Sequence, residues 1–180
     1  MDITGMIIHI LKEFGLYKEF PKFIPKQYMW TYSYLTTPLS NLNYNIIKNN
    51  QNENIRKLMS EFLPSTISKR MLDSENEEYE ILMIRDYFNA VTGYCSSYIY
   101  YGYLGMYVLY IYMVILTVIG ILLSNKVKSG RKKTAFYSIM VVVYSFMFFY
   151  NTLNYVGISV AFWIDFIMLL KKNSFSRKKI

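Results

Sequence analysis

Asp165 is the residue whose type and position most suggest chemistry, because it is the only charged side chain within two long apolar stretches of this 180-residue chain. A carboxylate inside a membrane is costly and usually functional. Asp165 precedes Lys171 by six residues and Lys172 by seven, which places it about 9 Å from the end of its stretch and on the Lys172 face of a helix. We therefore predict a carboxylate near the membrane interface, paired with Lys172 or with the cations of the central loop. The alternative is an intramembrane ion or proton site.

The remaining candidate residues do not form a catalytic constellation. One cysteine and one histidine exclude a disulfide framework and a cysteine-based zinc site. We interpret Cys95 as a buried small apolar residue, with lipid attachment as the alternative. No acid and nucleophile accompany His9 in a recognisable spacing, and no glycine-rich phosphate loop occurs. We expect a protein that is not an enzyme and that uses no cofactor or metal.

Two clusters of cations flank the second apolar stretch. The first contains Lys126, Lys128, Arg131, Lys132 and Lys133, and the second contains Lys171, Lys172, Arg177, Lys178 and Lys179. Residues 87–180 thus hold ten Lys or Arg and one Asp (+9), whereas residues 1–86 hold ten Lys or Arg and eleven acids (−1). A nucleic-acid-binding protein would need a basic face on a soluble domain. These cations instead border apolar stretches, where they set orientation and meet anionic lipid heads.

Arg177 and Lys178 stand fourth and third from the end of the chain. This spacing resembles the C-terminal dibasic retrieval signal of endoplasmic-reticulum membrane proteins, which a receptor reads on a cytosolic tail. The usual signal has lysine at both positions, so a plain basic cluster at the membrane edge is the alternative.

The elements that must position these residues are the two apolar stretches, 87–124 and 134–170. Apolar stretches of 18 or more residues are candidate membrane spans. A straight helix over the 38 residues of the first stretch would extend about 57 Å, nearly twice the roughly 30 Å hydrocarbon core. We therefore predict an all-α integral membrane protein with two helical hairpins, bent at 102–105 and at 151–154. The four predicted helices cover 87–101, 106–124, 135–150 and 155–170.

The positive-inside rule predicts the orientation of these hairpins. It places the basic loop at 125–133 and the basic tail at 171–180 in the cytosol. Two flanks on one side require an even number of crossings, so 134–170 should go out and come back. Two crossings by 87–124 put residues 1–86 in the cytosol, as we expect, whereas one crossing at about 104–124 puts them in the lumen. The helices are short, about 23 to 28 Å, and fit a thin bilayer such as the endoplasmic reticulum or hairpins that do not fully cross.

The N-terminal region, 1–86, is polar or amphipathic. Residues 1–20 place apolar side chains at spacings of three and four, which predicts an amphipathic helix that lies on the membrane or packs on another helix. Residues 22–40 contain two prolines and are predicted to be irregular. Residues 41–54 include seven asparagines and are predicted to form a solvated linker. A short helix at 55–63 and an acidic patch at 73–80 complete the region.

Two local motifs within residues 85–127 suggest a family. They are Tyr87-Phe88 with Gly93, and Ile115–Leu122 with Asn125-Lys126. Together with the layout of residues 87–173, they resemble the prenylated Rab acceptor family. Ile84 stands where that family has an asparagine, so no partner-binding residue is carried over. The resemblance implies a non-enzymatic four-helix protein of endoplasmic reticulum and Golgi membranes, linked to Rab GTPases, vesicle traffic or membrane shape.

We expect a multi-pass protein of endoplasmic reticulum or Golgi membranes that acts in vesicle-mediated transport or membrane shaping. Its expected partners are membrane lipids and small GTPases such as Rab proteins, and no nucleic acid. The alternative is an accessory or regulatory subunit of a larger membrane complex, such as a cation pump or respiratory assembly, with an interface lined by tyrosines and small residues of 94–112. A transporter would need more buried polar groups than Asp165 supplies.

Overall fold

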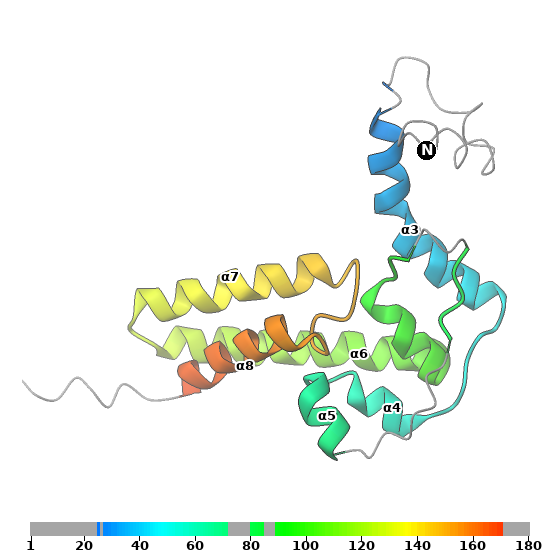
Figure 1. Ribbon diagram of the computed structural model, residues 1–180. Helices are drawn as coiled ribbons and strands as arrows, with labels where there is room; N and C mark the ends of the chain where they lie inside the picture. The colour runs from blue at the N-terminus through cyan, green and yellow to red at the C-terminus, as the bar shows by residue number, and fades with distance from the viewer. Residues whose placement is uncertain (1–24, 26, 72–79, 85–88, 171–180) are drawn as a thin grey trace, which may run out of the picture.

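The structure, a computed structural model, describes residues 25, 27–71, 80–84 and 89–170 (Figure 1). The described residues form six α-helices and no β-strand, which confirms the all-α prediction. The helices are α3 (Gln27–Ile47), α4 (Ile55–Ser60), α5 (Ser65–Met71), α6 (Gly93–Lys126), α7 (Gly130–Phe146) and α8 (Val156–Leu170). Three predicted features lie outside the described residues: the helix at 1–20, the tail at 171–180 and all of the acidic patch except Glu80.

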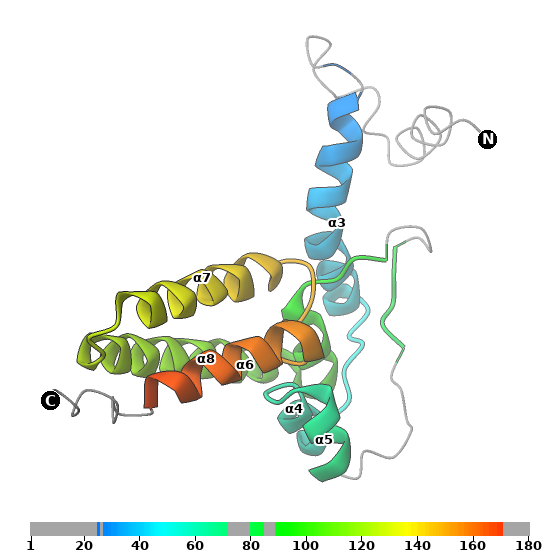
Figure 2. The same ribbon diagram turned by 60° about the vertical axis from the view of Figure 1, so that its left-hand side comes forward.

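An antiparallel bundle is formed by α6, α7 and α8, joined by turns at 127–129 and 147–155 (Figure 1, Figure 2). Apolar side chains spaced three and four apart on each helix meet in its core. They are Leu109, Met113 and Leu116 of α6, Phe136, Met140 and Val143 of α7, and Phe162, Phe166 and Leu169 of α8. The second apolar stretch is therefore a helical hairpin, and its turn includes the predicted bend at 151–154.

The first turn of α7 and the last turn of α8 lie at the same end of the bundle, on the left in Figure 1. Lys132 Nζ at the start of α7 donates a hydrogen bond to the Met168 carbonyl oxygen near the end of α8, at 3.2 Å. The cations around the α6–α7 turn and the C-terminal end of α8 consequently share one end of the bundle. The α7–α8 turn lies at the other end, beside α4 and α5 (Figure 2).

A sharp kink divides α6, and here the structure differs from the predicted first hairpin. Gly102 has φ +59° and ψ −151°, a conformation that only glycine adopts readily, so α6 consists of 93–100 and 103–126. The kink falls at the predicted bend. The first arm, however, has eight residues rather than the fifteen predicted, and at about 12 Å it is too short to cross a bilayer. Backbone N–H groups of Asn52 and Asn54 bind the carbonyl oxygens of Ile99 and Tyr100 at 2.6 and 2.9 Å, which satisfies groups that the kink frees.

Two predictions for the N-terminal region are wrong. Helix α3 occupies 27–47, where an irregular segment and the start of a solvated linker were expected, and it contains Pro38. Tertiary contacts outweigh the proline, because Asn41 and Asn45 are fully buried rather than solvated. The next helix, α4, begins after Asn54, whose side chain caps it by accepting from the Lys57 N–H at 3.1 Å.

Among the described residues, α6 is the one helix long and apolar enough to cross a membrane, and α8 is a shorter apolar helix.

Candidate functional site

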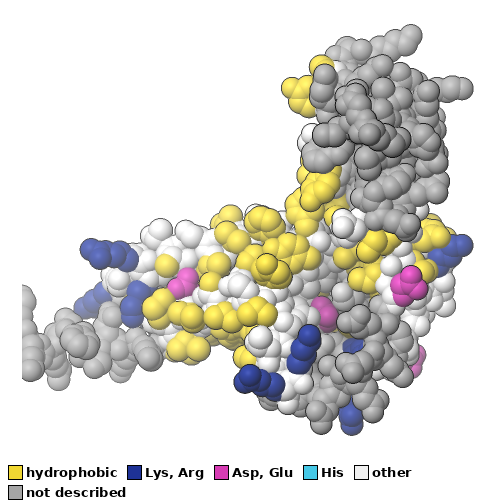
Figure 3. All heavy atoms as spheres, in the orientation of Figure 1, with side chains coloured by type: hydrophobic (Ala, Val, Ile, Leu, Met, Phe, Trp, Pro, Cys, Tyr) yellow, Lys and Arg dark blue, Asp and Glu magenta, His cyan; other side chains and the backbone are white. Residues whose placement is uncertain are grey.

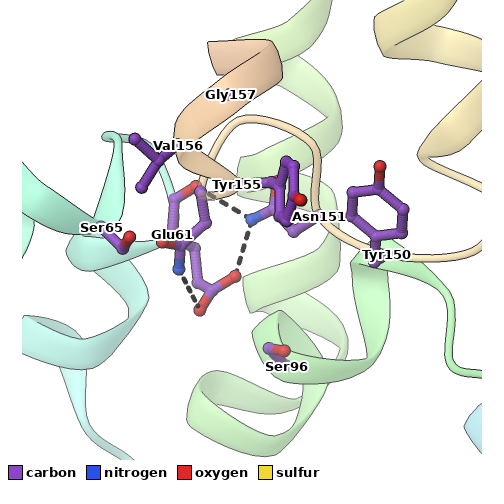
Figure 4. A pocket seen from close by; sticks show the side chains of 9 residues that line it. Glu61, Ser65, Ser96, Tyr150, Asn151, Tyr155, Val156 and Gly157 are labelled. Carbon is purple, nitrogen blue, oxygen red and sulfur yellow. Dashed lines mark hydrogen bonds between the residues drawn. The ribbon is translucent and has the colours of Figure 1, made fainter. Parts of the chain in front are cut away.

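Glu61, the residue that follows α4, is the one buried carboxylate among the described residues, with 5% of its surface exposed. Asn151 Nδ2 donates to Glu61 Oε2 at 2.6 Å and also to the Glu61 backbone carbonyl at 2.9 Å. Asn154 Nδ2 donates to Oε1 at 3.2 Å (Figure 4). Each carboxylate oxygen therefore accepts one amide hydrogen bond from the α7–α8 turn.

Local structure fixes both sides of this contact. The Glu61 backbone N–H closes α4 by donating to the Leu58 carbonyl oxygen at 3.1 Å. Opposite, Asn151 Oδ1 accepts from the Leu153 N–H at 3.1 Å, which turns its Nδ2 toward Glu61. Ser65 N–H then donates to the Asn154 carbonyl oxygen at 3.1 Å. These contacts hold the α4–α5 turn against the α7–α8 turn.

A pocket of about 720 Å³ opens beside Glu61, between the α4–α5 turn, the first arm of α6 and the α7–α8 turn (Figure 4). The rings of Tyr150 and Tyr155, with centroids 5.4 Å apart, line part of it. Ser65 and Ser96 add hydroxyl groups to the lining. The pocket thus combines one carboxylate with neutral hydrogen-bonding groups and aromatic surface.

Burial raises the pKa of the Glu61 carboxyl above its ordinary value of 4.5, and the hydrogen bonds from Asn151 and Asn154 oppose that effect more weakly. The site can hold a proton or accept a donor group. No three metal-ligating side chains gather anywhere in the described part of the chain.

A second polar junction joins α3 to the segment before α6. Asn45 Nδ2 donates to the Leu82 carbonyl oxygen at 2.7 Å, and Asn45 Oδ1 accepts from the Leu82 N–H at 3.1 Å. Asn41 forms a similar pair of bonds, donating to the Ala90 carbonyl oxygen at 2.8 Å and accepting from the Ile84 N–H at 3.0 Å. These side chains replace the backbone partners that an irregular segment otherwise lacks.

The predicted basic residues of the central loop are brought together around the α6–α7 turn. Lys126, Lys128 and Arg131 are exposed there, whereas Lys132 and Lys133 are half-buried at the start of α7. The other predicted cations, Lys171, Lys172, Arg177 and Lys178, lie outside the described residues.

Asp165 is half-buried on α8 and forms no ion pair with any residue that the structure describes. Its predicted partner Lys172 lies outside the described residues, so the pairing remains a prediction. Cys95 is fully buried in a small cluster with Tyr98 and Ile99, which confirms its interpretation as a packed apolar residue.

Sequence reasoning missed Glu61 and its two partners. Asn151 and Asn154 were interpreted only as turn formers, and Glu61 was not singled out. The three-residue spacing of the asparagines, around one bend, was the available signal for a paired role. The partner ninety positions away in the sequence had no local signal.

A comparison with protein-family models found no match to the chain, and comparisons with curated proteins and with solved structures found none either.

Proposed function

We propose that this chain is a non-catalytic membrane protein in which α6, α7 and α8 each cross the bilayer once, and that it serves as an accessory subunit of a larger membrane complex. In this arrangement the α6–α7 turn faces the cytosol. Residues before the kink, including α3, α4 and α5, lie on the opposite, lumenal side.

The proposal is carried by the exposed side chains of α6, which change in type from one end of the helix to the other. Tyr103, Tyr107 and Tyr110 are exposed near the kink, exposed aliphatic side chains continue from Ile111 to Leu122, and Lys126 is exposed at the end. Tyr107 and Lys126 are 19 residues apart (126 − 107), about 28 Å along a helix, close to the roughly 30 Å hydrocarbon core. Tyrosines at one interface, aliphatics between and cations at the other are typical of a membrane span.

Burial supports the same assignment. A helix that is apolar on all sides is normally covered by protein or by lipid. Within the most apolar run of 18 residues in α6, only 22% are buried inside the protein. Figure 3 shows hydrophobic side chains spread along the visible face of the bundle and Lys and Arg side chains at the end formed by the α6–α7 turn. Lipid, together with the partner protein proposed here, would cover this surface.

The single crossing by α6 favours the subunit function over a Rab-linked one. Small GTPases act in the cytosol, where this arrangement exposes only the basic loop and the residues after α8. Among the tyrosines of 94–112, which are expected at a subunit interface, Tyr103, Tyr107 and Tyr110 are exposed, whereas Gly102 and Gly105 in the same region are buried within the chain. The partner surface is therefore aromatic, and it lies at the lumenal end of α6.

One observation supports a second candidate, membrane shaping in the endoplasmic reticulum or Golgi. The α7 and α8 helices have 17 and 15 residues, about 26 and 22 Å, whereas the long arm of α6 is about 36 Å. A hairpin shorter than the bilayer thins it or enters it as a wedge. Rab binding would accompany this second candidate function and not the first. Rab binding would also require residues 1–86 to be cytosolic.

Purification of the full-length tagged chain in mild detergent tests the choice. The subunit function predicts stoichiometric recovery with one large membrane protein, reduced at least severalfold by Tyr107→Ala. Tyr28→Ala, at an exposed tyrosine on α3, is the matched control and should leave recovery unchanged. Recovery of small GTPases in a nucleotide-dependent manner, with no stoichiometric partner, would support the second candidate instead.

A further inference from the structure

An apolar slot of about 350 Å³ lies between α6 and α7. The ring of Phe136 lies directly over Gly120, and a side chain at that glycine would collide with it. Other aromatic side chains of α7 bridge the helices on either side of this contact. The slot lies beside this contact, and its lining includes Ile121, Met140 and Val141.

The bridges are hydrogen bonds that pair the hydroxyl groups of Tyr137, Tyr144 and Thr117, which line the slot. Tyr137 Oη and Ser124 Oγ form a hydrogen bond at 2.6 Å at one end. At the other end, Tyr144 Oη bonds to Thr117 Oγ1 and donates to the Met113 carbonyl oxygen at 3.1 Å. The two tyrosines are seven residues apart, about 10 Å along α7. What remains for an occupant is almost entirely apolar surface.

The basic end of the bundle lies one helical turn beyond the Tyr137 end of the slot. Positions 133, 137, 141 and 144 recur on one face of α7, so Lys133 stands one helical turn beyond Tyr137 on the slot face, where it is half-buried. Exposed Lys126 and Lys128 lie across the turn. An apolar slot with cations one helical turn beyond its end is complementary to a molecule with a hydrocarbon chain and an anionic head.

We propose that the α6–α7 slot binds one acyl chain of an anionic phospholipid whose phosphate contacts Lys133. This inference rests on the proposed membrane function, which places the basic end at the cytosolic leaflet, where anionic lipids are concentrated. A helix from another protein, with a diameter of about 10 to 12 Å, is too wide to enter the slot between the Tyr137 and Tyr144 bridges. A single hydrocarbon chain is narrower, and it can enter there and pass outside the exposed Tyr137 ring toward Lys133.

The test uses the purified full-length chain in detergent, with dioleoylphosphatidylserine added and dioleoylphosphatidylcholine as the neutral-head comparison. Near saturation, phosphatidylserine should raise the Tm of the wild-type chain about 5 °C more than phosphatidylcholine does. Lys133→Gln should weaken the apparent affinity for phosphatidylserine roughly fivefold. Val141→Trp fills the slot and should abolish the difference. Val160→Trp, at an exposed position on α8, is the matched control that should retain it.

Equal shifts with the two lipids, or a phosphatidylserine shift that survives Val141→Trp, would overturn the proposal. The proposal would also be overturned if Val141→Trp lost a bound protein but kept its lipid binding. That result would mean that a helix of the bound protein occupies the slot. Extraction of the chain from membranes by alkaline carbonate separates the two proposals. A chain that resists extraction but does not distinguish the lipids refutes only the slot, whereas an extracted chain refutes the membrane function as well.

Discussion

Asn151 donates its side-chain amide to the Glu61 carboxylate at 2.6 Å, across ninety positions of sequence. This contact ties the α4–α5 turn to the turn between α7 and α8, and a pocket opens beside it. In the proposed arrangement it lies at the lumenal end of the bundle. It therefore couples the part of the chain before the kink to the helices proposed to cross the membrane.

Replacing Asn151 with alanine should lower the free energy of unfolding by about 2 to 3 kcal/mol. The buried carboxylate loses a charge-assisted donor, and the Leu153 N–H loses its acceptor. Thermal unfolding of the purified chain, followed by circular dichroism, measures the change. Asn43→Ala, at an exposed position on α3, is the control and should stay within about 0.5 kcal/mol of the wild type. Equal losses in the two variants would mean that the contact contributes nothing.

The raised pKa of Glu61 predicts how stability depends on pH. Above the ordinary value of 4.5, the folded chain keeps a proton at Glu61 that the unfolded chain has released. Stability is therefore greatest below that value and falls as pH rises through the raised folded pKa. Unfolding measured from about pH 4 to pH 8 should show this decrease in the wild type, and the Glu61→Gln variant should lack it. A variant with the same slope as the wild type would assign the decrease to another group.

Asn45 should control the order of the segment before α6. Its side chain exchanges two hydrogen bonds with the Leu82 backbone, so Asn45→Ala should speed hydrogen exchange of the Leu82 amide by roughly tenfold or more. Exchange mass spectrometry of peptides covering 80–84 measures this. Asn43→Ala again serves as the control, because Asn43 is exposed on the same helix. Unchanged exchange in Asn45→Ala would show that this junction does not hold the segment.

The kink in α6 should depend on Gly102. An alanine there would occupy a backbone region that L-residues avoid and would collide with the Gln51 side chain. We expect Gly102→Ala to destabilise the chain by about 1 to 3 kcal/mol in thermal unfolding. Gly130→Ala is the matched control, since nothing lies within 4 Å of the added carbon, and helix propensity makes it neutral or slightly favourable. A harmless Gly102→Ala would argue for a continuous straight helix instead.

Local sequence patterns predicted the hairpin over 134–170 and the position of the bend near Gly102, because apolar length, glycine and asparagine act over a few residues. They did not predict α3, where Pro38 and an asparagine-rich composition suggested irregular structure. The hydrogen-bond partners that bury Asn41 and Asn45 lie 37 to 49 positions away in the sequence, so no local pattern indicated that these side chains are buried. The Glu61 site was hidden for the same reason. That site forms only where the α4–α5 turn meets the α7–α8 turn, and the sequence of one turn gives no indication of the other.

Cysteine labelling from each side of sealed membranes tests the central claim, the single crossing by α6, most directly. Asn125→Cys places a thiol at the basic loop, and Glu53→Cys places one before the kink, both at exposed positions. The wild-type chain is the control, since its one cysteine, Cys95, is buried. With the cytosolic face outward, an impermeant maleimide should label Asn125→Cys at once and Glu53→Cys only after the membrane is permeabilised. Labelling of both thiols from the same side would contradict the single crossing.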